Sequence, residues 1–166
     1  TKPLCSLVEE HPLWTQWLVD VKRIGLVQAG LLLGTWGKTA VLNNVAQVWS
    51  SSNLGVNADG TAQRRRTHGK VRPGYGPFVT ACTLMRDCLL RARGAYFELK
   101  EVIQVKEMNR LADEGHARRR GMRLMSKIFL AHMWRYMRES HGLPVPALYP
   151  FAFLNHDPAS YIEPLR

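Results

Sequence analysis

The chain has 166 residues, of which 46% are hydrophobic and 22% charged, a composition that fits one folded globular domain and argues against intrinsic disorder. Its 23 lysine and arginine residues outnumber the 13 acidic ones and give a net charge of +10, which favours a nucleic-acid partner over a basic protein without a polyanionic one. Three cysteines without a CxxC pair argue against a disulfide framework and a zinc site, and the most apolar run, residues 24–34, is too short to span a bilayer.

The first part of the chain predicts helices around a tight turn. From Pro12, which suits the first turn of a helix, apolar residues recur at three- and four-residue spacing as far as Val21. Residues 22–25 interrupt this pattern, and a second apolar helix is expected to begin at Leu26. A third helix should follow Thr39, whose hydroxyl suits the N-cap position.

In the middle of the chain the helical spacing of apolar residues gives way to a different pattern and then returns. Apolar and polar residues alternate over residues 54–63 around Asp59 and Gly60, a pair typical of tight hairpin turns, so we expect a short β-hairpin there. A turn over residues 73–77 then precedes an amphipathic helix that ends near Gly94.

Two further helices and a tail complete the chain. A helix with dispersed charges is expected over residues 96–111, and a long helix should run from about Asp113 to Glu139. From Gly142 the sequence is rich in proline and aromatic residues, which predicts an extended tail that lies over the body or over a partner.

These elements predict a mostly α-helical fold that contains a helix-hairpin-helix, one short β-hairpin, a long C-terminal helix and an extended proline-rich tail. We expect the parts to form one compact unit. They are a nucleic-acid-binding region over residues 1–94, a helical extension over residues 95–141 and the tail over residues 142–166.

The turn between the first helices is a candidate contact with nucleic acid. Its sequence RIGLVQA, residues 23–29, approximates the hairpin G-h-G-x-x-x-A of helix-hairpin-helix modules, with Arg23 in place of the first glycine. In such a hairpin Gly25 lets the backbone approach a duplex and the amides of the next helix bind a phosphate, while Arg23 adds a charge. A plain helix C-cap accounts for Gly25 equally well. The pair Gly74 and Gly76 repeats the pattern more literally.

A basic loop is the second candidate contact. Five basic residues fall within nine positions without an acidic residue among them, and such charges repel one another unless phosphates or surface acids screen them. The cluster therefore favours a nucleic-acid contact, and a solvated loop is the alternative. Its members are Arg64, Arg65, Arg66, Lys70 and Arg72.

The last long helix presents a third candidate surface. Arg120, Arg123 and Lys127 share a face with Trp134, which suits either a strand-tracking surface with a stacking aromatic or a helix buried on two sides. The opposite face gathers apolar side chains around His132, which we interpret as a core histidine with paired nitrogens.

No motif in the sequence predicts chemistry by this chain alone. A P-loop, an HExxH pair and a convincing pair of carboxylates are lacking, and the histidines have no metal-ligand spacing. A nucleophile among the serines at residues 50–52 is the least favoured hypothesis, because no spaced histidine and aspartate support it. We therefore expect no catalytic residue, no metal and no cofactor.

The order of the parts resembles that of a known domain over residues 21 to about 90. KRIGLVQA is similar to a hairpin PGIGPxTA, VWSSSNLGV to a YAGL segment, ADGTAQRRRTHGKV to a Ser-Gly with a basic stretch, and GPFVTACTLMRDCLL to the helix after it. In this order they resemble the small C-terminal domain of the RuvC-type (DEDD) insertion-sequence transposases guided by bridge RNA, the family numbered one hundred and ten. The later run GHARRRGMRLMSKIFLAHMW resembles extensions of some relatives of that domain.

Two differences from that family determine which function we expect. Ala58 and Asp59 stand where the family's catalytic serine is expected, and the acidic RuvC-like domain is missing from these residues. The resemblance thus implies a non-catalytic component of a mobile-element complex that binds DNA, guide RNA or both beside other protein chains, away from membranes, in the cytoplasm or nucleoid. The alternative is a structural RNA-binding subunit of a ribonucleoprotein such as a ribosome, in which the tail docks on neighbours.

Overall fold

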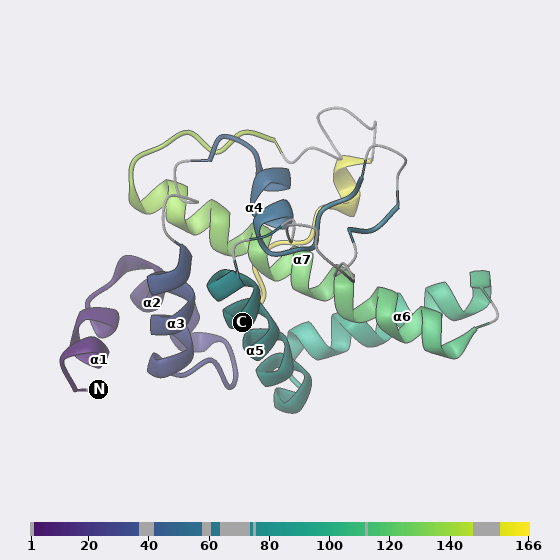
Figure 1. Cartoon of the computed structure of the whole chain (residues 1–166), viewed down its shortest axis with the longest axis horizontal. Helices are drawn as coiled ribbons and strands as arrows, with labels where there is room; N and C mark the ends of the chain where they lie inside the picture. Colours follow the sequence, from purple (N-terminus) through teal and green to yellow (C-terminus); the bar gives the residue numbers. More distant parts are fainter. Residues whose placement is uncertain are drawn as a thin grey trace.

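The structure, a computed structural model, describes residues 2–36, 42–57, 61–63, 74, 76–111, 113–147 and 157–166. Over these residues it is mostly α-helical, as predicted, and contains no β-strand (Figure 1). The elements are α1 (Lys2–Glu9), α2 (Pro12–Gln16), the 3-10 helix η1 (Leu18–Asp20), α3 (Leu26–Trp36), α4 (Val45–Ser51), α5 (Gly76–Ala92), α6 (Ala95–Leu111), α7 (Glu114–Ser140) and the 3-10 helix η3 (Pro158–Ser160).

The predicted helix from Pro12 to Val21 is wrong in its second half. Pro12 does begin α2, behind the N-cap His11, whose Nδ1 accepts a hydrogen bond from the Leu13 amide at 3.1 Å. The helix ends before Trp17, whose φ of −149° leaves the helical region, and η1 follows. Trp17 is completely buried and its ring stacks on Tyr136 with centroids 5.2 Å apart, so tertiary packing of one large ring overrides the local periodicity.

The third helix begins later than the sequence suggests. Asn44, and not Thr39, is the N-cap of α4, because its Oδ1 accepts a hydrogen bond from the Ala46 amide at 2.8 Å. Thr39 lies outside the described residues. Val45, Val48 and Trp49 are buried, as their spacing predicts.

At the predicted hairpin the described residues hold a single antiparallel bridge between Val56 and Ala62. The Gln63 amide donates to the Gly55 carbonyl at 3.1 Å beside it. Asp59 and Gly60, the expected turn, lie outside the described residues.

Helices α3 and α5 pack against each other and run antiparallel. The end of α3 therefore lies near the start of α5, and the start of α3 lies near the end of α5. At one end the ring of Trp36 meets that of Phe78, with centroids 5.3 Å apart. At the other end Gly94 lies against Lys22, since a Cβ added to Gly94 would be 3.4 Å from the Cβ of Lys22. The turn before α3 and the turn after α5 therefore lie side by side.

Helices α6 and α7 form a long antiparallel pair that extends to the right of α5 in Figure 1. The break between them is capped by Asp113, whose Oδ1 accepts a hydrogen bond from the His116 amide at 2.8 Å. The two backbones approach closely at Gly121, where an added Cβ would lie 3.0 Å from the carbonyl oxygen of Lys100.

One buried apolar cluster contains side chains from the region before Gly94 and from α6 and α7, and Leu165 of the tail packs against it, so the three predicted parts share a core. Trp17, Phe129 and Tyr136 form its aromatic centre, with Trp17 and Phe129 centroids 5.1 Å apart. None of the helices in the described part of the chain has the length and apolar character that a membrane crossing needs.

The end of the tail lies against this aromatic centre. Trp17 Nε1 donates to the Leu165 carbonyl at 2.9 Å, and His132 Nε2 lies 2.7 Å from the Ile162 carbonyl. Arg135 adds contacts to Tyr161 and Glu163. Residues 161–166 thus lie against the body of the same chain.

Candidate nucleic-acid interface

The predicted hairpin before α3 forms an exposed turn. Arg23 adopts a positive φ of 66°, the left-handed region in which glycine is favoured, and its side chain is exposed. Gly25 is also exposed, and a Cβ added to it would meet no atom within 4 Å. Packing therefore does not require glycine at this position, whereas close approach of a ligand to the backbone would.

A second turn of the same kind follows α5. Arg93 has a positive φ of 47° and is exposed, and its guanidinium lies 5.1 Å from the centre of the Phe97 ring. The next residue, Gly94, packs against Lys22 of the first turn. Two arginines with left-handed backbones thus come from adjacent turns.

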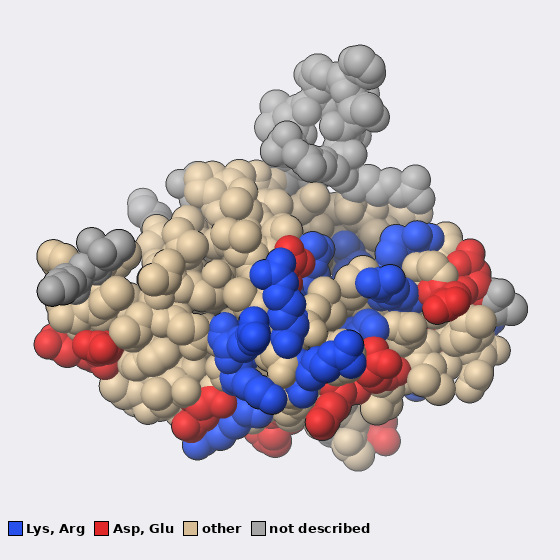
Figure 2. All heavy atoms as spheres, turned by 90° about the horizontal axis from the view of Figure 1, so that it is seen from below, with Lys and Arg blue, Asp and Glu red and all other residues tan. Residues whose placement is uncertain are grey.

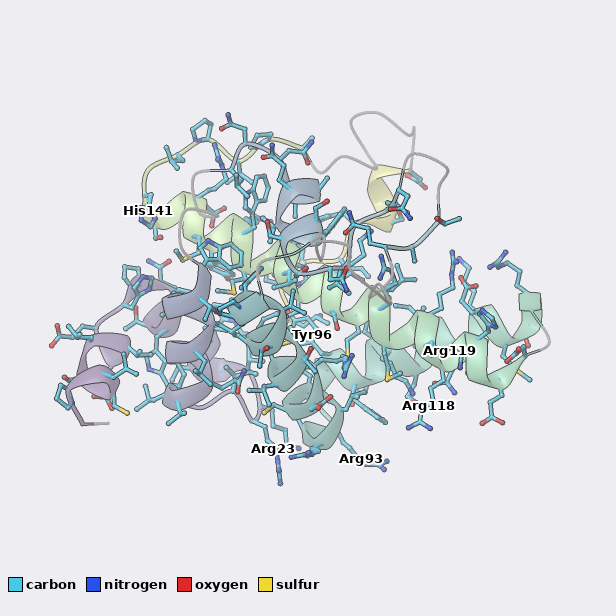
Figure 3. The ribbon with its side chains drawn as sticks, in the orientation of Figure 1. Arg23, Arg93, Tyr96, Arg118, Arg119 and His141 are labelled. Atoms are coloured by element: carbon cyan, nitrogen blue, oxygen red, sulfur yellow. The ribbon has the colours of Figure 1, made fainter. Side chains whose placement is uncertain are left out.

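Lys22, Arg23, Arg93 and Arg166 make up a surface that we call the basic end. Arg166 reaches it from the tail, where it lines a shallow space with Lys22 and pairs with Asp20 at 2.8 Å. Figure 3 shows Arg23 and Arg93 close together at the lower edge of the molecule, pointing away from the helices. Seen from below in Figure 2, lysine and arginine side chains gather near the middle of the face, with acidic ones among and around them.

Backbone donors accompany these charges. The first intrahelical bonds run from the Ala29 amide to the Gly25 carbonyl and from the Glu98 amide to the Gly94 carbonyl. The amides before them, at the N-termini of α3 and α6, have no carbonyl one turn back within their helix, and the helix dipoles place positive potential there. The N-termini of α3 and α6 therefore lie beside these cations, and amides at a helix N-terminus together with nearby cations can bind phosphate.

Gly74 and Gly76 do not belong to the basic end. Gly74 precedes α5 and Gly76 is its first residue, whereas the basic end follows α5, and a helix of 17 residues is roughly 25 Å long. An added Cβ at Gly74 would lie 2.8 Å from the Ser51 carbonyl oxygen and 2.9 Å from Val79 Cγ2. Close packing against the end of α4 explains this glycine without a ligand.

Replacing Gly74 with alanine is expected to destabilise the protein by about 2 kcal/mol, because the new methyl group overlaps a backbone carbonyl that cannot move freely. The same change at Gly76, which has open space around its Cα, should cost little or nothing. Urea denaturation of the two variants checks this, and equal stabilities would contradict the packing role of Gly74.

Each of the three predicted cations of α7 has a partner within the chain, and Arg120 remains exposed. Arg120 Nε pairs with Glu107 at 2.8 Å, and Arg123 donates from Nη2 to the carbonyls of Leu54, at 2.7 Å, and Gly55. Lys127 Nζ lies 4.0 Å from the centre of the Trp49 ring, and burial lowers its pKa to about 8. The structure therefore does not bring these side chains together with Arg23 and Gly25.

Of the two interpretations of Trp134, a stacking aromatic or part of a helix buried on two sides, the second is correct. The ring is 1% exposed, and Nε1 donates to the Leu42 carbonyl at 2.9 Å. Arg138 is also buried and donates to the same carbonyl, so neither side chain is available for a base or a phosphate. The basic loop, Arg64, Arg65, Arg66, Lys70 and Arg72, lies outside the described residues.

Sequence reasoning missed three residues of the basic end. Lys22 and Arg93 had a signal, because each belongs to a short basic and glycine-containing break between helices, as Arg23 does. No local pattern points to Arg166, which arrives only through the docking of the tail.

Within the described residues, no group of three or more histidine, cysteine, aspartate or glutamate side chains is placed to hold a metal ion. Comparison of the chain with protein-family models, with curated proteins and with solved structures returns no match.

Proposed function

We propose that these residues bind nucleic acid through the basic end and serve as a non-catalytic part of a larger, mobile-element-related complex. The phosphate backbone is the ligand of the basic end, since its groups are cations and backbone amides without a base-reading pattern. The resemblance of the hairpin, the basic stretch and the helices to the transposase domain supports the choice of complex.

The strained arginines carry this proposal. A left-handed backbone at a residue with a Cβ costs about 1–2 kcal/mol, and glycine would adopt it without that cost. Among the described residues only Arg23, Asn53 and Arg93 are non-glycine residues with positive φ, and both arginines lie on the basic end. Strain that recurs beside a cluster of like charges is typical of a site where the side chain has a function.

A salt titration of binding tests the proposal. Fluorescence anisotropy with labelled duplex and single-stranded DNA and RNA should show tight binding at low salt. If Lys22, Arg23 and Arg93 each neutralise one phosphate, log affinity should fall by about three units per tenfold rise in salt. Binding that does not depend on salt, or no binding to any of the four, would refute it.

The larger complex needs a separate experiment. Purification from the native host, followed by sequencing of the bound nucleic acid, distinguishes DNA from RNA. Identification of the chains that co-purify tests the association with a nuclease. Recovery of the chain alone and free of nucleic acid would contradict both parts of the proposal.

A further inference from the structure

A polar cavity lies at the end of α5 away from the basic end, among α4, α5 and α7. Its volume is about 350 Å³, which is enough for a small organic ligand. Asn53, two residues after the end of α4, and Thr83, on α5, line this cavity and also a neighbouring hollow of about 350 Å³. The two spaces are therefore neighbours that share part of their lining.

The charged residues of the cavity lining are all arginines: Arg86, Arg119 and Arg123. Arg123 is fixed in place by its bonds to the carbonyls of Leu54 and Gly55, and burial lowers its pKa. Arg86 pairs with its neighbour Asp87 at 3.1 Å. The guanidinium of Arg119 lies beside Gly115. The hydrogen bond from the His116 amide lowers the pKa of Asp113, and the charge of Arg119 adds to this effect without a direct salt bridge among the described residues. A cavity lined in this way suits an anionic group such as a phosphate.

Two amide oxygens in the lining lack a hydrogen-bond partner among the described residues. Asn53 Oδ1 and Gln63 Oε1 are buried, and neither accepts a hydrogen bond from any described residue. Buried polar atoms without a partner are rare in folded proteins and call for an explanation. A ligand with N–H donors would supply the missing bonds.

The remaining wall of the cavity is apolar. Val79, Leu54 and Met122 provide surface on which a flat ring can pack. Asparagine and glutamine amides pair with the edge of adenine, where a donor and an acceptor lie next to each other. Amides, apolar wall and arginines together match the three parts of a nucleotide: its base edge, its base face and its phosphate.

We infer that this cavity binds a nucleoside monophosphate unit with a purine base, through the amides of Asn53 and Gln63 and the cations of Arg119 and Arg123. The unit has two sources, a free nucleotide or one residue of a single strand turned out of its stack. The inference deepens the proposed function and rests on it for the second source.

Three variants isolate the cavity. Asn53→Gly removes one amide while glycine retains the backbone, whose φ is 62°. Thr83→Leu fills the cavity from an exposed position on α5. Thr35→Leu on α3 is the matched control, because its hydroxyl, like that of Thr83, bonds to the carbonyl four residues earlier and it does not line the cavity.

Calorimetric titration of the full chain with AMP tests the free nucleotide as source. We expect saturable binding that Asn53→Gly and Thr83→Leu each weaken by at least about tenfold and that Thr35→Leu leaves unchanged. Inorganic phosphate at the same concentration should not displace AMP, because it lacks the base. Full displacement by phosphate, or equal binding by all three variants, would overturn the inference.

A single-stranded oligonucleotide with one 2-aminopurine tests the strand as source. Its fluorescence should rise when wild-type protein unstacks the base, and the two cavity variants should abolish the rise. If the protein shows no binding of AMP and also no rise in 2-aminopurine fluorescence, the inference is overturned. Salt-dependent duplex binding should persist in the cavity variants and weaken in Arg23→Gln, so failure of this inference and failure of the proposed function are separate results.

Discussion

Replacing both Arg23 and Arg93 with glycine is expected to make the protein more stable and to weaken its binding to nucleic acid. Glycine relieves the left-handed strain at φ 66° and 47°, a gain of about 1 kcal/mol per site. Loss of two charge-assisted contacts costs about 1.5 kcal/mol each, or about a hundredfold in Kd at low salt. Urea denaturation measures the first effect, and anisotropy titration with labelled nucleic acid measures the second.

Two controls separate strain from charge. Arg23→Gln with Arg93→Gln should weaken binding to a similar extent without a gain in stability, because glutamine keeps the strained backbone. Arg118→Gln on α7, an exposed arginine away from the basic end in Figure 3, should change neither property by much. A glycine pair that binds as tightly as the wild type would leave the two arginines without a role in binding.

The stability of the protein is expected to fall as the pH drops from about 6.5 to 4, because His132 is buried without charge. Its neutral ring accepts a bond from the Tyr96 hydroxyl at Nδ1 and donates from Nε2 to the Ile162 carbonyl, each at 2.7 Å. Burial lowers the pKa of His132 to about 4, so the unfolded chain takes up the proton first. The free energy of unfolding should therefore be unaffected above pH 6.5 and lose about 3 kcal/mol by pH 4.

Denaturation of His132→Gln over the same range is the control. The variant starts less stable, and its dependence on pH between about 6.5 and 4.5 should be much shallower than that of the wild type. A small slope should remain, since the pKa of His11 is also lowered by burial. An NMR titration that finds His132 half-protonated near pH 6.5 would contradict the expectation.

The helices themselves could be predicted, because their determinants are local. Apolar spacing identified the buried faces of α5 and α7, and Gly25, Gly94 and Asp113 identified where helices stop or start. The break at Trp17 could not be predicted in this way. The position of Trp17 is set by its ring contact with Tyr136 and its hydrogen bond to Leu165, and both residues lie far along the chain.

The candidate site was predictable only in part, for a related reason. Periodicity shows that Arg120 and Arg123 share a helix face, but it does not show that Glu107 and the carbonyl of Leu54 lie across from them. Conversely, the partnership of Arg23 with Arg93 follows from the antiparallel packing of α3 on α5, which no single segment encodes. Charge along the sequence thus identified one turn of the basic end, and the fold supplied the other.

The hydrogen bond from Trp17 to Leu165 has a kinetic consequence, because it joins residues 148 positions apart. Closing so long a loop is entropically costly and contributes to a high contact order, so this contact should form late in folding. Until Leu165 has been synthesised, a nascent chain leaves the indole N–H of Trp17 without its acceptor. Pulsed hydrogen exchange during refolding should therefore find that indole protected only after the amides of α5 and α7.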